Sequence, residues 1–451
     1  MEGLDTGSNA WILTSAALVL LMTPGLALFY GGLTRAKSVV NMMMKCLAAI
    51  GIVTLLWVIY GASIAEGDTG NAFWGGLSDL GMRGLLDFEA SHDGGVSGGA
   101  LTAFAMMFAI ITVALISGAV ADRMKFSAWV IFAAIWVTVV YFPVAYWVWG
   151  DGFIEDWGVL DFAGGTAVHV NAGAAALALA LVVGRRLGWR NGAFAPHNLP
   201  LVLLGTGLLW FGWFGFNGGS AFASDDIAGL ALLNTHIATG AAALAWLATD
   251  RLRGVKPSIL GGCSGVIAGL VAITPAAGHV EPLGAIAVGL IAGAICPFAI
   301  SLKHRLGYDD ALDVVGLHMV AGAWGSVAVG FFAVPEISDG TAGVFYGGQF
   351  SFLGLQALAV LVVAAYSFIV ALLIALALKH TLGVRVDSEQ ELAGIDGTEH
   401  GESGYDLPLN GHDSGEDSLG AADSAQASDV SQRHSAESTS TKKDTSAAIP
   451  T

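Results

Sequence analysis

Charged residues are scarce in this sequence, and they are almost absent from its long apolar segments. Only 12% of the 451 residues are Asp, Glu, Lys or Arg, whereas 55% are apolar. Soluble domains contain about 25% charged residues, so the composition excludes an ordinary soluble protein. The apolar runs lie between residues 10 and 378, and a polar, acidic stretch follows them.

Cysteine is also rare, with only Cys46, Cys263 and Cys296 in the whole chain. All three lie in or beside apolar runs at unrelated spacings, which favours neither a disulfide framework nor a zinc site. We therefore expect three buried packing residues. We expect no cofactor, no bound metal, no enzymatic reaction and no nucleic-acid partner.

The apolar runs have the length of membrane-spanning helices. A helix needs roughly 20 apolar residues to cross the bilayer, whereas transmembrane strands would give short alternating segments. The sequence therefore predicts an all-α polytopic membrane protein with eleven transmembrane helices. We expect them near residues 10–31, 46–64, 100–120, 127–149, 164–184, 199–217, 228–249, 258–275, 284–302, 314–334 and 352–378.

Basic residues are unevenly distributed among the predicted loops. Fifteen Lys and Arg follow odd-numbered helices, whereas the alternate loops contain only Arg83. Because cytoplasmic loops are enriched in Lys and Arg, we expect the N-terminus (residues 1–9) outside and the C-terminus inside. The fifteen residues are Arg35, Lys37, Lys45, Arg123, Lys125, Arg185, Arg186, Arg190, Arg251, Arg253, Lys256, Lys303, Arg305, Lys379 and Arg385.

An internal repeat divides the predicted membrane domain, residues 10–378. Asp161 precedes His169 by eight residues, and Asp310 precedes His318 by the same interval. Similar Gly-Gly-ended segments, at residues 28–32 and 215–219, close the first and sixth helices. Five helices in each half require the second half to be inverted, which is a transporter architecture. We expect repeats at about 10–184 and 199–334, with the eleventh helix (352–378) added.

The three ionisable residues well inside the predicted spans are His169, His236 and His318. The lack of mid-membrane carboxylates argues against a carboxylate-based ion site. The inverted repeat would bring His169 and His318 together, where burial and like charge both disfavour a charged imidazole. A neutral pair could share one hydrogen bond and still offer a donor or acceptor to a small neutral solute. His236 lacks an apparent partner and is interpreted as a packing residue.

Two further features lie near the outer ends of the helices. Asp161 precedes the glycine pair that opens the fifth helix, where a carboxylate can cap free N–H groups and strengthen a cation site. Phe104 and Phe108 share one face of the third helix. Such rings could bind a small cation or form an ordinary interfacial aromatic belt, and composition alone does not decide between these roles.

Five motifs together resemble the Amt/Mep/Rh family of ammonium transporters. The resemblance covers residues 10–406, and the opening segment Gly25–Gly32 is also similar to the family's first helix. The motifs are Asp161-Phe-Ala-Gly-Gly-Thr-Ala-Val-His169, Pro196-His-Asn-Leu-Pro200, Gly212-Trp-Phe-Gly-Phe-Asn-Gly-Gly-Ser220, Lys256-Pro-Ser-Ile-Leu-Gly-Gly-Cys-Ser-Gly265 and Asp313-Val-Val-Gly-Leu-His318.

The resemblance assigns roles to individual residues. It implies an external ammonium site and a gate beneath it, followed by a histidine-lined pore for ammonia. Trp149 and Ser220 favour the ammonium-transporter branch over the Rhesus branch. The implied substrate-binding residues are Phe104, Trp149, Ser220 and Asp161, the gate is Phe108 and Phe216, and the pore pair is His169 and His318.

The resemblance also implies partners. It predicts a homotrimer in the cell membrane, surrounded by lipid, with ammonium or ammonia as substrate and methylammonium as a further candidate. Residues 379–406 resemble a cytoplasmic regulatory region that docks PII-type regulators, and residues 407–451 are predicted to be a disordered acidic tail. The alternatives are an ammonium sensor that signals through this tail and a pore for urea or a neutral gas.

Overall fold

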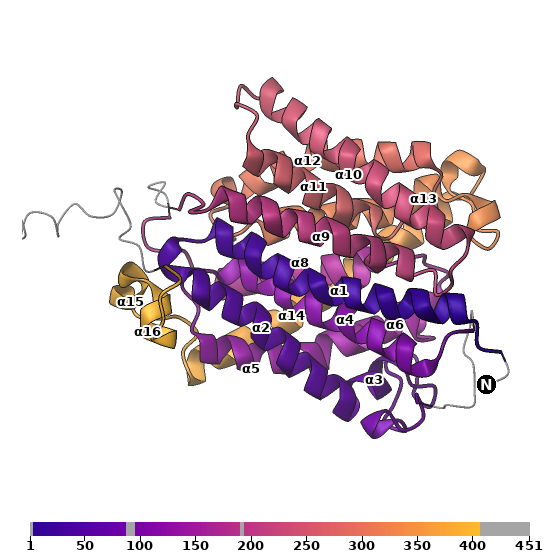
Figure 1. Cartoon of the computed structure of the whole chain (residues 1–451), viewed down its shortest axis with the longest axis horizontal. Coiled ribbons are helices and arrows are strands. Elements are labelled where there is room, and N and C mark those ends of the chain that lie inside the picture. The colour runs from indigo at the N-terminus through magenta and orange to yellow at the C-terminus, as the bar shows by residue number, and fades with distance from the viewer. Residues whose placement is uncertain (1–2, 87–94, 190–193, 406–451) are drawn as a thin grey trace, which may run out of the picture. The chain divides into compact units, whose positions relative to one another are not determined.

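The computed structural model describes residues 3–86, 95–189 and 194–405 (Figure 1). These residues form helices joined by loops, and β-pairing in them is limited to two isolated bridges. The all-α prediction is therefore confirmed. Residues 1–404 form one compact unit, whereas the predicted tail at 407–451 lies outside the described residues.

The first half contains five long helical segments. Four of them combine α-helix with short turns of π- or 3₁₀-helix. In chain order the elements are α1 (Thr6–Leu33), α2 (Val39–Leu56) with η2 (Trp57–Gly61) and α3 (Ala62–Glu66), α4 (Gly98–Ile116) with η5 (Ser117–Val120), α5 (Phe126–Trp136) with η6 (Val137–Tyr141) and α6 (Phe142–Trp149), the short α7 (Phe153–Asp156), and η7 (Gly165–Val170) with α8 (Asn171–Val183).

The second half repeats this arrangement, and one long helix and two short ones follow it. Its elements are α9 (Leu199–Gly219), α10 (Asp226–Leu252), α11 (Ile259–Ile273), α12 (Pro282–Leu306), and η9 (Val315–Val320) with α13 (Ala321–Phe332). The chain then continues through α14 (Phe350–Thr381), α15 (Ser388–Ala393) and α16 (Ile395–His400).

Ten of these segments in the described part of the chain are long and apolar enough to cross a membrane. The remaining one, α11, has 15 residues, which corresponds to about 22 Å of helix and falls short of a bilayer core of about 30 Å. α11 packs against α9, α10, α12 and α13, and most of its residues are buried. The eighth predicted segment, expected at 258–275, is therefore present but shorter than expected.

One predicted boundary was wrong. The second helix was expected to begin at residue 46, but α2 begins at Val39. Lys45 consequently lies inside a helix and is fully buried, so it is not one of the loop cations. The expectation failed because the run 39–45 contains Asn41 and Lys45, and their polarity lowers the apparent hydropathy of this turn.

The two halves share a local structure at their fifth segments. In each half a π-helical turn carries the histidine, in η7 for His169 and in η9 for His318. The first helices of the two halves, α1 and α9, pack closely together (Figure 1). Their approach depends on small residues, because a Cβ at Gly205 would lie 2.3 Å from the backbone nitrogen of Phe29. Small residues commonly permit such packing between membrane helices.

The loops that follow the odd-numbered helical segments carry basic residues, and they contact one another at one end of the bundle. Arg186, after α8, forms a salt bridge with Asp309, after α12, with Nε and Oδ2 2.9 Å apart. The backbone N–H of Lys125 donates to the carbonyl of Val384 at 3.0 Å, which joins the loops after η5 and α14. Because all of these loops follow odd-numbered segments, the contacts agree with an odd number of membrane crossings between the N-terminus and the region after α14.

Candidate functional site

The predicted external residues lie at the ends of three segments. Trp149 ends α6 and is 37% exposed. Its indole N–H donates to the backbone carbonyl of Asp161 at 2.8 Å, which fixes the ring over the loop before η7. Phe104 of α4 is buried, and Ser220 follows α9 with its hydroxyl donating to the carbonyl of Phe216 at 2.8 Å.

Two phenylalanine rings lie between Trp149 and the histidine pair. Phe108 and Phe216 stack with centroids 4.1 Å apart and an interplanar angle of 24°. Phe108 also lies edge-on to Phe104 at 4.8 Å and to Trp149 at 6.1 Å. The structure therefore brings the two predicted gate residues into contact and joins them to the exposed indole.

The two predicted pore histidines lie below this ring pair. Nδ1 of His169 and Nδ1 of His318 are 3.2 Å apart, and both rings are buried. In a neutral pair one Nδ1 must donate and the other must accept. Nε2 of His169 has no hydrogen-bond partner among the described residues, so it is free to interact with a small solute. The ring of Phe216 lies 6.1 Å from that of His169.

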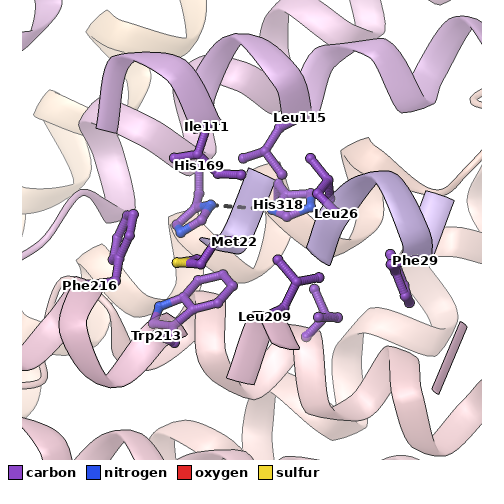
Figure 2. Close-up of a pocket in the computed structure, with 11 residues that line it drawn as sticks. Met22, Leu26, Phe29, Ile111, Leu115, His169, Leu209, Trp213, Phe216 and His318 are labelled. Atoms are coloured by element: carbon purple, nitrogen blue, oxygen red, sulfur yellow. Dashed lines mark hydrogen bonds between the residues drawn. The ribbon is translucent and has the colours of Figure 1, made fainter. Parts of the chain in front are cut away.

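A narrow cavity surrounds the histidine pair, and its other walls are almost entirely apolar (Figure 2). Carbon and sulfur atoms therefore surround the two imidazoles, and no carboxylate or ammonium group lines this space. The lining residues are Met22, Leu26, Phe29, Ile111, Leu115, His169, Leu209, Trp213, Phe216, Ile267 and His318.

Asp161 has a well-defined structural role. Its Oδ1 accepts from the N–H groups of Gly164 and Gly165 at 2.9 and 2.6 Å. Its Oδ2 accepts from those of Thr166 and Ala167 at 2.9 and 3.1 Å. The carboxylate thus caps the start of η7, as its position before the glycine pair predicted. Burial raises the pKa of Asp161, and the four amide bonds oppose that rise.

Trp213 is a residue of this site whose place we did not predict. Its ring stacks on His169 with centroids 5.4 Å apart and planes 18° apart (Figure 2). Its indole N–H donates to Oγ1 of Thr274 at 2.7 Å. Its spacing of three from Phe216 was the available signal, because residues i and i+3 share a helix face.

His236 does not lie where we expected it. It is exposed on the surface of α10 and stacks on Trp210 of α9, with centroids 5.3 Å apart. It is therefore remote from the histidine pair and is not buried in the bundle. The three cysteines, in contrast, are free and buried as predicted.

Helices of membrane-spanning length enclose a buried, apolar cavity that contains paired histidines, and stacked rings connect it to an exposed indole. This arrangement defines a polytopic membrane protein with a buried polar pair in an apolar core. The family model described as the Ammonium Transporter Family matches residues 10–405. The chain belongs to that family and is an ammonium transporter.

Comparisons with individual proteins agree with this assignment. The chain is 53% identical to an ammonium transporter of Mycobacterium tuberculosis, covering 90% of this chain and 91% of the relative. It is 48% identical to one from Aquifex aeolicus, covering 90% and 94%. Among solved structures, Candida albicans Mep2 matches with a TM-score of 0.80 at 36% identity, covering 86% of this chain and 88% of that one.

Proposed function

We propose that the chain recruits ammonium at an outer aromatic site, removes its charge there, and conducts ammonia past the histidine pair. The observation that carries this proposal is the continuous series of rings from the exposed Trp149 through Phe108 and Phe216 to the buried His169. Aromatic faces attract a small cation, and the oxygen of Ser220 can accept an N–H bond.

The surroundings of the pore explain why the charge would be left outside. A bare cation in an apolar medium pays a large desolvation penalty, whereas a neutral amine pays little. The cavity around the histidines offers a cation no carboxylate. Imidazole nitrogens, however, can exchange hydrogen bonds with ammonia. The passage therefore favours ammonia over ammonium and over Na⁺ or K⁺.

The external site is tested by three substitutions, Phe104→Ala, Trp149→Leu and Ser220→Ala. Each should raise the half-saturation concentration for ammonium, and the aromatic losses should cost about 0.5–2 kcal/mol of binding free energy each. The measurement is ammonium-driven current and uptake in proteoliposomes at several pH values, which also shows whether charge moves with the substrate. Unchanged half-saturation in all three variants would remove the cation site.

We propose that the protein is a homotrimer in the cell membrane, with the N-terminus outside and the C-terminus inside. The basic loops support this orientation. His236 supports a subunit contact, because an exposed imidazole facing hydrocarbon is costly. Beside it, Nε1 of Trp210 is buried without a hydrogen-bond partner in the described part of the chain. A second copy on this face of α9 and α10 would cover the exposed imidazole.

We further propose that the region after α14 is regulatory and is the docking site for a PII-type protein. Its acidic residues bind the starts of membrane helices: Asp396 accepts from the N–H groups of Val40 and Asn41, at 3.0 and 2.8 Å. Glu399 accepts from the N–H of Phe126 at 2.8 Å. A segment held in this way can transmit a change of position to α2 and α5.

A sensor is the alternative function. A solved structure titled Sensor Amt Protein matches with a TM-score of 0.81 at 30% identity and covers 87% of this chain. Truncation after residue 406 separates the two functions. Intact transport with lost nitrogen signalling would favour a sensor, whereas intact transport and signalling would show that the tail serves neither function.

A further inference from the structure

Phe222 is an aromatic residue at the outer mouth that does not belong to the site described above. It lies two residues after Ser220, in the turn between α9 and α10, and 44% of it is exposed. Its ring stands nearly perpendicular to that of Phe104, with an interplanar angle of 86° and centroids 6.1 Å apart. It therefore continues the series of rings outward from Phe104 into solvent.

The backbone at this position is unfavourable for phenylalanine. Phe222 has a φ of +52°, a left-handed conformation that glycine and asparagine adopt readily and bulky residues rarely adopt. Residues strained in this way tend to cluster at functional sites. Burial offers little compensation here, because 44% of the residue is exposed. The strain therefore requires another explanation, and the ring's position provides one.

The turn that holds Phe222 is fixed at both ends. The N–H of Phe222 donates to the carbonyl of Gly219 at 2.9 Å. The N–H of Ser224 donates to the hydroxyl of Ser8 in α1 at 3.1 Å, and Asp225 caps α10 by accepting from the N–H of Ala228 at 2.9 Å. The ring is consequently presented on a pre-organised turn, which reduces the entropy lost when it binds a ligand.

The charges beside this turn favour a cation. Asp225 and Asp226 are both exposed and begin α10 three and four residues after Phe222. Exposed carboxylates raise the local concentration of cations at the entrance. An arriving ammonium ion would therefore meet the acidic pair, then the Phe222 ring, and then the buried ring of Phe104.

We propose that Phe222 is a specificity-determining outer contact of the transporter. In this role its ring forms the rim of the ammonium site and binds ammonium and N-methylated ammonium before they reach Phe104, Trp149 and Ser220. The proposal rests on the proposed external site and adds an outer step to it. Methylammonium should depend on the rim more strongly, because its methyl group gains apolar contact with the ring in addition to the cation–π attraction.

The test uses Phe222→Leu, which removes the ring, and Phe222→Tyr, which keeps it. Phe73→Leu is the matched control, because Phe73 is 61% exposed but contacts Phe153 at 5.5 Å outside this series of rings. Uptake of labelled methylammonium, and its inhibition by ammonium, are measured in cells without their own ammonium transporters. Surface expression is measured for every variant.

Phe222→Leu should raise the half-saturation concentration for methylammonium about two- to fivefold, with a smaller rise for ammonium. Phe222→Tyr and Phe73→Leu should behave as wild type. An unchanged value in Phe222→Leu would overturn the proposal, as would an equal rise in Phe222→Tyr, because loss of the ring would then not explain it. If Trp149→Leu weakens affinity while Phe222→Leu does not, the external site stands and only the rim is lost.

Discussion

The contact between His169 and His318 predicts that the two residues act as a unit. Their Nδ1 atoms are 3.2 Å apart and both rings are buried, so neither imidazole can replace its partner with bulk water. We consider His169→Ala, His318→Ala and the double variant. His304→Ala is the control, because His304 is an exposed histidine near the C-terminal end of α12 and stacks on Trp189.

The size of the coupling between the two histidines follows from the group that each single substitution leaves unpaired. Losing one ring removes a hydrogen bond with a net value of about 0.5–1.5 kcal/mol. It also leaves a buried polar nitrogen on the remaining ring without a partner, which costs about 1–3 kcal/mol. In the double variant no such nitrogen is left, so the second substitution should add little. The coupling free energy should therefore lie within the range of about 0.5–3 kcal/mol observed for residues in contact.

The assay is ammonium uptake in proteoliposomes, with current recorded in ammonium, Na⁺ and K⁺. We expect both single variants to lose transport or to admit cations, because the lost ring leaves the pair incomplete and widens the cavity. The double variant should resemble the poorer single variant, and His304→Ala should transport normally. Additive losses, agreeing within about 0.5 kcal/mol, would refute the coupling. Two single variants with normal, selective transport would show that the histidines only pack.

Three further predictions concern the ends and the surface of the bundle. Asp161→Asn should turn two accepting contacts into donor–donor contacts, which costs about 1–3 kcal/mol of stability per unpaired amide. It should lower the melting temperature far more than Asp5→Asn, the control at the exposed start of α1. Equal effects would contradict the capping role. Burial raises the pKa of Asp310 to about 6, so its stabilising contribution is present below pH 3.8 and is lost as pH rises through 6. Between pH 4 and 6.5 the melting temperature of Asp310→Asn should therefore fall less than that of the wild type. Parallel melting-temperature curves would refute this. His236→Glu should dissociate the proposed trimer in mild detergent, so an unchanged mass would remove this face from the subunit contact.

The sequence predicted the histidine contact because it depends on register. The interval of eight residues between Asp161 and His169 recurs between Asp310 and His318, and inverted halves bring equivalent positions together. Asp161 was predictable as a cap for a similar local reason, since the glycine pair after it marks a helix start. These features are encoded within short segments, so a single sequence reveals them.

Other features depend on contacts between distant segments, and the sequence did not reveal them. The indole of Trp213 is held beside His169 by Thr274, which lies 61 positions away. The exposure of His236 depends on which face of α10 meets α9 and α11. That face is not apparent from a helix that is apolar on most sides. Hydropathy likewise placed Lys45 in a loop, because hydropathy depends on the charge of a residue and not on the packing that buries its side chain.

The structure also shows that the two repeats differ where their sequences agree. The carboxylate of Asp161 accepts four backbone N–H groups, so it neutralises the positive end of η7 directly below the ring of Trp149. Asp310, its counterpart, accepts from the N–H of Val315 at 2.8 Å through Oδ2, while its buried Oδ1 has no partner in the described residues. A fully capped helix start does not repel an arriving ammonium ion. The repeat thus supplies a symmetric pair of histidines, whereas the unequal caps at its two ends support the proposal that the cation is received at the Asp161 end.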